Sequence, residues 1–199
     1  MVNDYSPQRI PTDKRRLLLS SLHAIVDVKN RFPSQIFKGI WSEFLFFDSD
    51  WMFDSQFIEI AKAMLEIERG ECACVLELDA NTDARENCFF IGRETSTSDY
   101  SSFLAERHRL HALGRFACLS ASEQWCIYCE TRNEMAVIGI RGDYFTKQRS
   151  IAAQAFKACP IKEAVSLPIS YGFSARALSD EWRIELLKQY GEVGSTKTS

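Results

Sequence analysis

The chain has 199 residues, of which 46% are hydrophobic, and its formal net charge at pH 7 is −3. A chain of this length buries a substantial core, and the composition excludes an intrinsically disordered protein. The weakly acidic balance gives no electrostatic footprint for nucleic acid. We therefore expect a single globular domain over 1–199, with flexible ends at 1–11 and 191–199.

The seven cysteines are an odd number, and most of them stand inside apolar runs. The amino terminus lacks the apolar core of a signal peptide, and no run approaches the ~20 apolar residues that cross a bilayer. These features predict a soluble cytoplasmic protein with free thiols and no membrane association.

In chain order, the first predicted element is a helix over about 13–30, which Pro33 ends. The aromatic segment 36–47 is either a strand or an irregular, partly buried run. A second helix is expected at about 55–69, and Gly70 is expected to end it in a left-handed backbone conformation. Two strands are expected next, at about 71–78 and 88–91. A helix at about 99–113 then begins at a Ser96–Asp99 capping box, and a strand follows it at about 115–119.

Residues Trp125–Ile140 have the pattern of two paired strands joined by the polar turn Thr131–Glu134. Closing this turn sets the register, because side chains alternate between the two faces along a strand. The expected neighbours are Glu130 with Met135, Tyr128 with Val137, and Cys126 with Gly139.

The same stretch contains Trp-Cys-x-x-Cys, the spacing of a thioredoxin-like redox site. In a strand, Cys126 and Cys129 point to opposite faces with Cα atoms roughly 10 Å apart, whereas a disulfide needs Cα atoms within about 7 Å. Redox pairs also stand at the start of a helix, and no helical pattern begins here. The alternative is a small thiol-redox or zinc enzyme that uses these two cysteines together with His108 and His111, which lie three apart on one predicted helix.

Two further helices are expected, from about 144 to 157 and from Ser179 to Tyr190. The strands form clusters rather than alternating strictly with helices. This order favours an α+β fold with a largely antiparallel sheet of about five strands, packed against several helices on one face. A doubly wound α/β sheet is the alternative.

Acidic residues supply the candidate contacts for a protein partner. Asp48, Asp50 and Asp54 flank Trp51, and carboxylates beside an aromatic anchor suit a protein-binding surface. Glu130 and Glu134 flank the hairpin turn. In the plainer interpretation, the aromatic residues of 48–54 dock into the core, Asp54 caps the next helix, and the two glutamates keep the sheet rim polar.

The chain contains no nucleophile elbow, no phosphate-binding loop and no dinucleotide fingerprint. We therefore assign no catalytic residue, metal ligand or cofactor from the sequence, and the chain is not expected to be an enzyme.

The helix ending in an aliphatic-Gly turn, the following strand, and the stretches EQWCIYCE and EMAVIGI resemble the C-terminal part of bacterial immunity proteins. Such proteins are encoded beside polymorphic or contact-dependent growth-inhibition toxins. The resemblance covers about residues 95–145 and falls on scaffold residues. It implies an intracellular inhibitor that binds a cognate toxin domain, in many cases a nuclease, and blocks its active site or substrate cleft.

Overall fold

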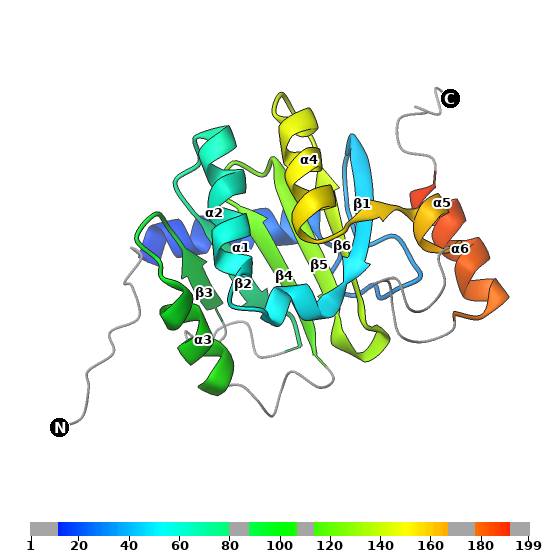
Figure 1. Ribbon diagram of the computed structural model, residues 1–199, viewed down its shortest axis with the longest axis horizontal. Helices are drawn as coiled ribbons and strands as arrows, with labels where there is room; N and C mark the ends of the chain where they lie inside the picture. The colour runs from blue at the N-terminus through cyan, green and yellow to red at the C-terminus, as the bar shows by residue number, and fades with distance from the viewer. Residues whose placement is uncertain (1–11, 80–87, 107–113, 167–177, 192–199) are drawn as a thin grey trace.

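The computed structural model describes residues 12–79, 88–106, 114–166 and 178–191 (Figure 1). The predicted flexible ends, except Gly191, lie outside these ranges. Within them, seven strands form one antiparallel sheet in the order β3-β2-β4-β5-β6-β1-β7. The strands are β1 Glu43–Asp48, β2 Ala73–Glu77, β3 Cys88–Ile91, β4 Arg115–Ser120, β5 Trp125–Glu130, β6 Met135–Ile140 and β7 Cys159–Pro160. The predicted α+β class is confirmed, and β1 and β7 raise the strand number above the expected five.

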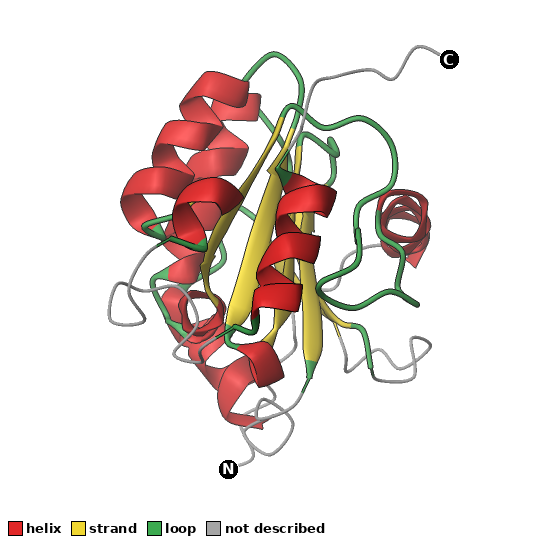
Figure 2. Cartoon of the chain, turned by 90° about the vertical axis from the view of Figure 1, so that its right-hand side faces the viewer, coloured by secondary structure: helices red, strands yellow, loops and turns green. Residues whose placement is uncertain are grey.

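Helices cover both faces of this sheet, as Figure 2 shows with the sheet close to edge-on. One apolar cluster contains residues of α1 (Thr12–Ile25), α5 (Ile161–Ala164) and α6 (Asp180–Tyr190). The cluster on the opposite face contains residues of α2 (Phe57–Glu68), α3 (Thr97–Glu106) and α4 (Phe145–Ala155). The expectation of one covered face was wrong, because every residue of β4, β5 and β6 is buried and both of their faces need cover.

The hairpin register predicted from the sequence is confirmed in all three pairs, Glu130–Met135, Tyr128–Val137 and Cys126–Gly139. The turn is a short 3-10 helix, η3 (Thr131–Asn133), and Glu134 then adopts a left-handed conformation with φ 54°. Gly139 has a steric reason to be glycine. A Cβ there would lie 2.9 Å from the ring of Trp41.

Helix boundaries differ from the expected ones where the chain makes specific contacts. The first helix stops at Ile25 rather than near residue 30, because Val26 pairs with Phe37 in an isolated β-bridge. The capping box before α3 is present, since Ser96 N donates to the Asp99 carboxylate at 2.9 Å and Asp99 N donates to Ser96 Oγ at 3.1 Å.

None of the helices in the described ranges is both long and apolar enough to cross a membrane.

Candidate functional site

The structure brings the two predicted acidic segments together at one end of the sheet. Asp48 is the last residue of β1 and pairs with Met135, the first residue of β6. The adjoining 3-10 helix η1 (Ser49–Phe53) contacts the hairpin turn through Ser49 N, which donates to Glu134 O at 3.4 Å. Figure 1 shows η1 and this turn at the same end of the sheet. We call the group Asp48, Asp50, Trp51, Asp54 and Glu134 the acidic end.

Two carboxylates of the acidic end shape the backbone. Asp48 caps η1 by accepting a hydrogen bond from Asp50 N at 2.8 Å. Asp54 accepts one from Gln56 N at 2.7 Å in the turn before α2. The N-cap of α2 is Gln56, so the expected capping of this helix by Asp54 was wrong. Because these bonds need only an acceptor oxygen, asparagine can replace either aspartate and keep the turn.

The aromatic residues of this segment are partly anchored in the core. Met52 is fully buried, and the ring of Phe53 packs edge-on against Phe116 at a centroid distance of 5.2 Å. Trp51 is half-buried and packs edge-on against Phe156, with the two ring centroids 6.4 Å apart. The aromatic side chains of this segment therefore dock into the core, as in the plainer interpretation, while Asp50 and Asp54 remain exposed.

Negative charge accumulates at the acidic end. Partial burial raises the pKa of Asp48, and the nearby charges of Asp50 and Glu134 raise it further, against the lowering effect of the Asp50 N–H. Among the residues that the structure describes, no Lys or Arg forms an ion pair with Asp48, Asp50 or Asp54. A cation supplied by another molecule would therefore be attracted to this end of the sheet.

Glu130, predicted as a partner contact, is buried with only 2% of its surface exposed. Its Oε1 accepts hydrogen bonds from Phe32 N at 2.8 Å and from the Tyr128 hydroxyl at 2.6 Å, and its Oε2 accepts one from Asn133 Nδ2 at 2.5 Å. The carboxylate joins the loop after α1 to the hairpin. Glu130 is therefore unavailable to a partner, and we remove it from the candidate contacts.

Cys126 and Cys129 lie on opposite faces of β5, each fully buried in a different apolar cluster. Burial raises the pKa of both thiols well above the ordinary value, so neither is a thiolate at neutral pH. His108 and His111 lie outside the described residues. Within the described ranges, no group of three or more His, Cys, Asp and Glu side chains could hold a metal ion.

A further polar pair lies at the opposite end of β1, where Arg149 Nε donates to Glu43 Oε2 at 2.6 Å. No local sequence pattern points to this pair. The two residues are separated by 106 positions, and only the packing of α4 beside β1 brings them together.

Comparisons of the chain with protein-family models, with curated protein sequences and with solved structures found no match.

Proposed function

We propose that this chain is an immunity protein that binds and neutralises a bacterial toxin domain. In this proposal the acidic end faces the active site or substrate cleft of the toxin. The observation that carries the proposal is the concentration of carboxylates beside the half-buried Trp51, without Lys or Arg ion pairs to its three aspartates among the described residues. The resemblance of residues 95–145 to immunity proteins supports the same function.

Electrostatics suit a basic partner. Nucleases bind phosphate with cationic clefts, and an acidic surface of an inhibitor accelerates association with such a cleft by steering. Trp51 adds an aromatic surface, and aromatic residues are enriched among the side chains that dominate binding energy. Its contact with Phe156 fixes the ring before binding, which lowers the entropy lost on association.

The experiment is co-expression of this chain with the toxin domain encoded by the neighbouring reading frame. We expect the unaltered chain to restore growth, and the triple variant Asp48→Asn, Asp50→Asn and Asp54→Asn to restore it poorly. Asparagine keeps the acceptor oxygens that Asp48 and Asp54 use, so the variant should fold normally.

A matched control removes the same charge elsewhere, through Asp143→Asn, Glu163→Gln and Glu181→Gln, three exposed positions away from the acidic end. Full protection by the aspartate variant would contradict the assignment of the contact surface. A neighbouring reading frame without any toxin domain would contradict the function itself.

A further inference from the structure

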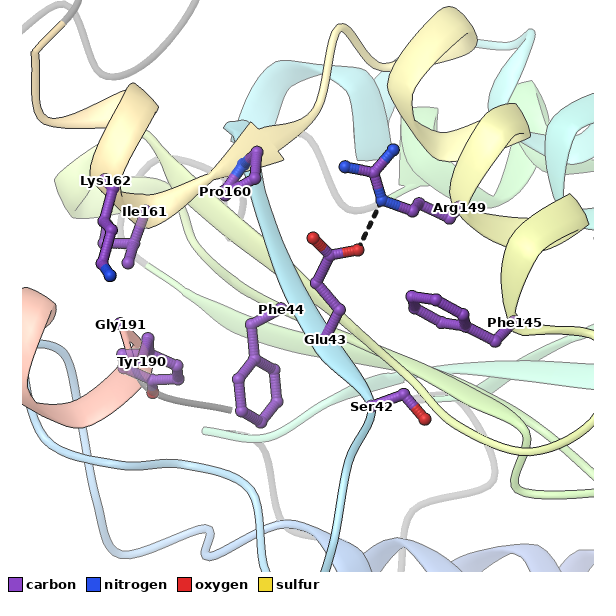
Figure 3. Close-up of a pocket in the computed structure, with 10 residues that line it drawn as sticks. All are labelled: Ser42, Glu43, Phe44, Phe145, Arg149, Pro160, Ile161, Lys162, Tyr190 and Gly191. Atoms are coloured by element: carbon purple, nitrogen blue, oxygen red, sulfur yellow. Dashed lines mark hydrogen bonds and ion pairs between the residues drawn. The ribbon is translucent and has the colours of Figure 1, made fainter. Parts of the chain in front are cut away.

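A hollow of about 270 Å³ lies at the end of β1 opposite the acidic end (Figure 3). The five residue steps of β1 separate the two ends by about 17 Å. The walls of the hollow are formed by the start of β1, by α4, by β7 with α5, and by the end of α6. Its volume is just below the usual range for drug-sized ligands, so it would accept a smaller molecule.

Two cationic side chains stand on different walls of the hollow. Arg149 reaches in from α4 and Lys162 from α5, and Figure 3 shows Glu43 and Phe44 of β1 between them. The Glu43 carboxylate holds Arg149 through Nε alone, and 43% of the arginine side chain remains exposed. Among the described residues, neither the terminal nitrogens of Arg149 nor the Lys162 ammonium has a hydrogen-bond partner.

The ion pair fixes the guanidinium in place. A guanidinium with free terminal nitrogens presents a planar fork that matches a carboxylate or phosphate group. Glu43 is already compensated by Arg149, so Lys162 gives these charged side chains a net charge of +1. The hollow therefore favours an anion over a cation.

The remaining lining is largely apolar and aromatic. Phe145 and Pro160 are partly exposed and face the hollow, whereas Phe44 and Tyr190 are buried behind it. The Tyr190 hydroxyl is already occupied, because it accepts from Ile36 N at 3.0 Å and donates to Ser34 O at 2.9 Å. The Tyr190 hydroxyl is therefore not available to a ligand.

We propose that this hollow binds a small organic anion, with its carboxylate or phosphate on the terminal nitrogens of Arg149, its flat apolar part against Phe145 one turn earlier on α4, and Lys162 on the facing wall adding positive potential. The site is separate from the acidic end and does not depend on the function proposed for it.

The test is an NMR titration of the intact chain with benzoate, phenyl phosphate, benzamide and inorganic phosphate. We expect saturable binding of benzoate or phenyl phosphate, with shifts centred on Phe145 and Ile161. The tighter of the two assigns the head group as carboxylate or phosphate. Benzamide lacks the charge and inorganic phosphate lacks the ring, so both should bind at least tenfold more weakly.

Arg149→Gln should weaken binding at least tenfold. Lys162→Gln should weaken it severalfold and is expected to fold normally, since Lys162 has no hydrogen-bond partner among the described residues. The control is Lys147→Gln, an exposed position on the same helix as Arg149 that does not line the hollow. Absence of saturable binding, equal affinity for benzamide, or an equal effect of all three substitutions would overturn the proposal.

Discussion

Glu68 is a buried carboxyl group, 8% exposed, without a cationic partner among the described residues. Burial raises its pKa above the ordinary 4.5, against the lowering effect of hydrogen bonds from Ser122, Ser120 and Gln148. Folding therefore favours the protonated form. The stability that this preference contributes is present below pH 4.5 and is lost as the pH rises through the raised pKa.

Glu68→Gln removes this pH dependence and keeps an oxygen for the bond that Gln148 Nε2 donates at 3.0 Å. At pH 7.5 we expect a Tm higher by about 2–4 °C, the shift that ~1 kcal/mol gives a domain of this size, and a smaller difference at pH 4. Scanning calorimetry of both chains at pH 7.5 and at pH 4 measures the difference in Tm. Glu66→Gln, at an exposed position of the same helix, should change little, and an equal gain from it would refute the explanation.

Glu130 and Glu134 flank the same turn but have different surroundings. Replacing Glu130 with alanine leaves three hydrogen-bond donors without their acceptor. Because a buried unsatisfied donor costs about 1–3 kcal/mol, Glu130→Ala should lower the free energy of unfolding by at least ~3 kcal/mol in a urea titration. Arg132→Ala, exposed in the same turn, should stay within about 0.5 kcal/mol of the original chain. Comparable stability of the two variants would show that Glu130 is not a structural link.

At the scale of an element, the end of α2 shows what its sequence could not specify. Gly70 was expected to take the left-handed conformation, but Arg69 does so, with φ 54°. Gly70 instead lies against buried atoms, since a Cβ there would be 2.6 Å from Glu68 Oε1 and 3.0 Å from Leu65 Cδ2. Two adjacent residues can each end a helix, and tertiary contacts decide between them.

Arg69→Gly should therefore raise the free energy of unfolding by roughly 0.5–1 kcal/mol, because glycine adopts positive φ without steric cost. Gly70→Ala should lower it by about 1–3 kcal/mol through overpacking. Chemical denaturation of the two variants checks both signs. A loss of stability in Arg69→Gly would place the left-handed residue at Gly70, as the sequence suggested, because alanine at Gly70 is destabilising in either case.

The hairpin was predictable in register because a short polar turn and an alternating pattern fix local pairing. The pairing of β1 with β6 was not predictable, since it joins residues 87 to 97 positions apart and no local spacing encodes it. That pairing places Asp48 and Asp50 beside Glu134. The sequence identified these acidic residues separately, but only the fold shows that they form one group.

At the scale of the whole molecule, the fold class followed from the clustering of strands, whereas the number of covered faces did not. The uninterrupted apolar runs of β5 and β6 are typical of strands buried on both faces. The order of the elements nevertheless favours a sheet with one covered face. The α1, α5 and α6 layer is assembled from the two ends of the described chain, and sequence periodicity does not assign helices to a face.

The distribution of thiols also belongs to this scale. Six of the seven cysteines are buried and Cys88 is half-buried. Burial raises the pKa of Cys159 to about 11, and those of Cys74 and Cys118 are raised as well. A disulfide-exchange reagent should therefore modify Cys88 first and the other six only on unfolding. Cys88→Ser should abolish the fast phase of the reaction with this reagent. A rapid, reversible disulfide between Cys126 and Cys129 would contradict the two-faced burial of β5.

The proposed function requires the acidic end to be the binding surface for a toxin domain. The most direct measurement is calorimetric titration of the purified chain with that domain, at two salt concentrations. We expect a 1:1 complex that Asp48→Asn, Asp50→Asn and Asp54→Asn together weaken at least tenfold, with less salt dependence and no fall in Tm, since the carboxylates repel one another in the folded chain. The control variant with Asp143→Asn, Glu163→Gln and Glu181→Gln should bind like the original chain. Unchanged affinity in the folded aspartate variant would contradict the role of the acidic end in binding.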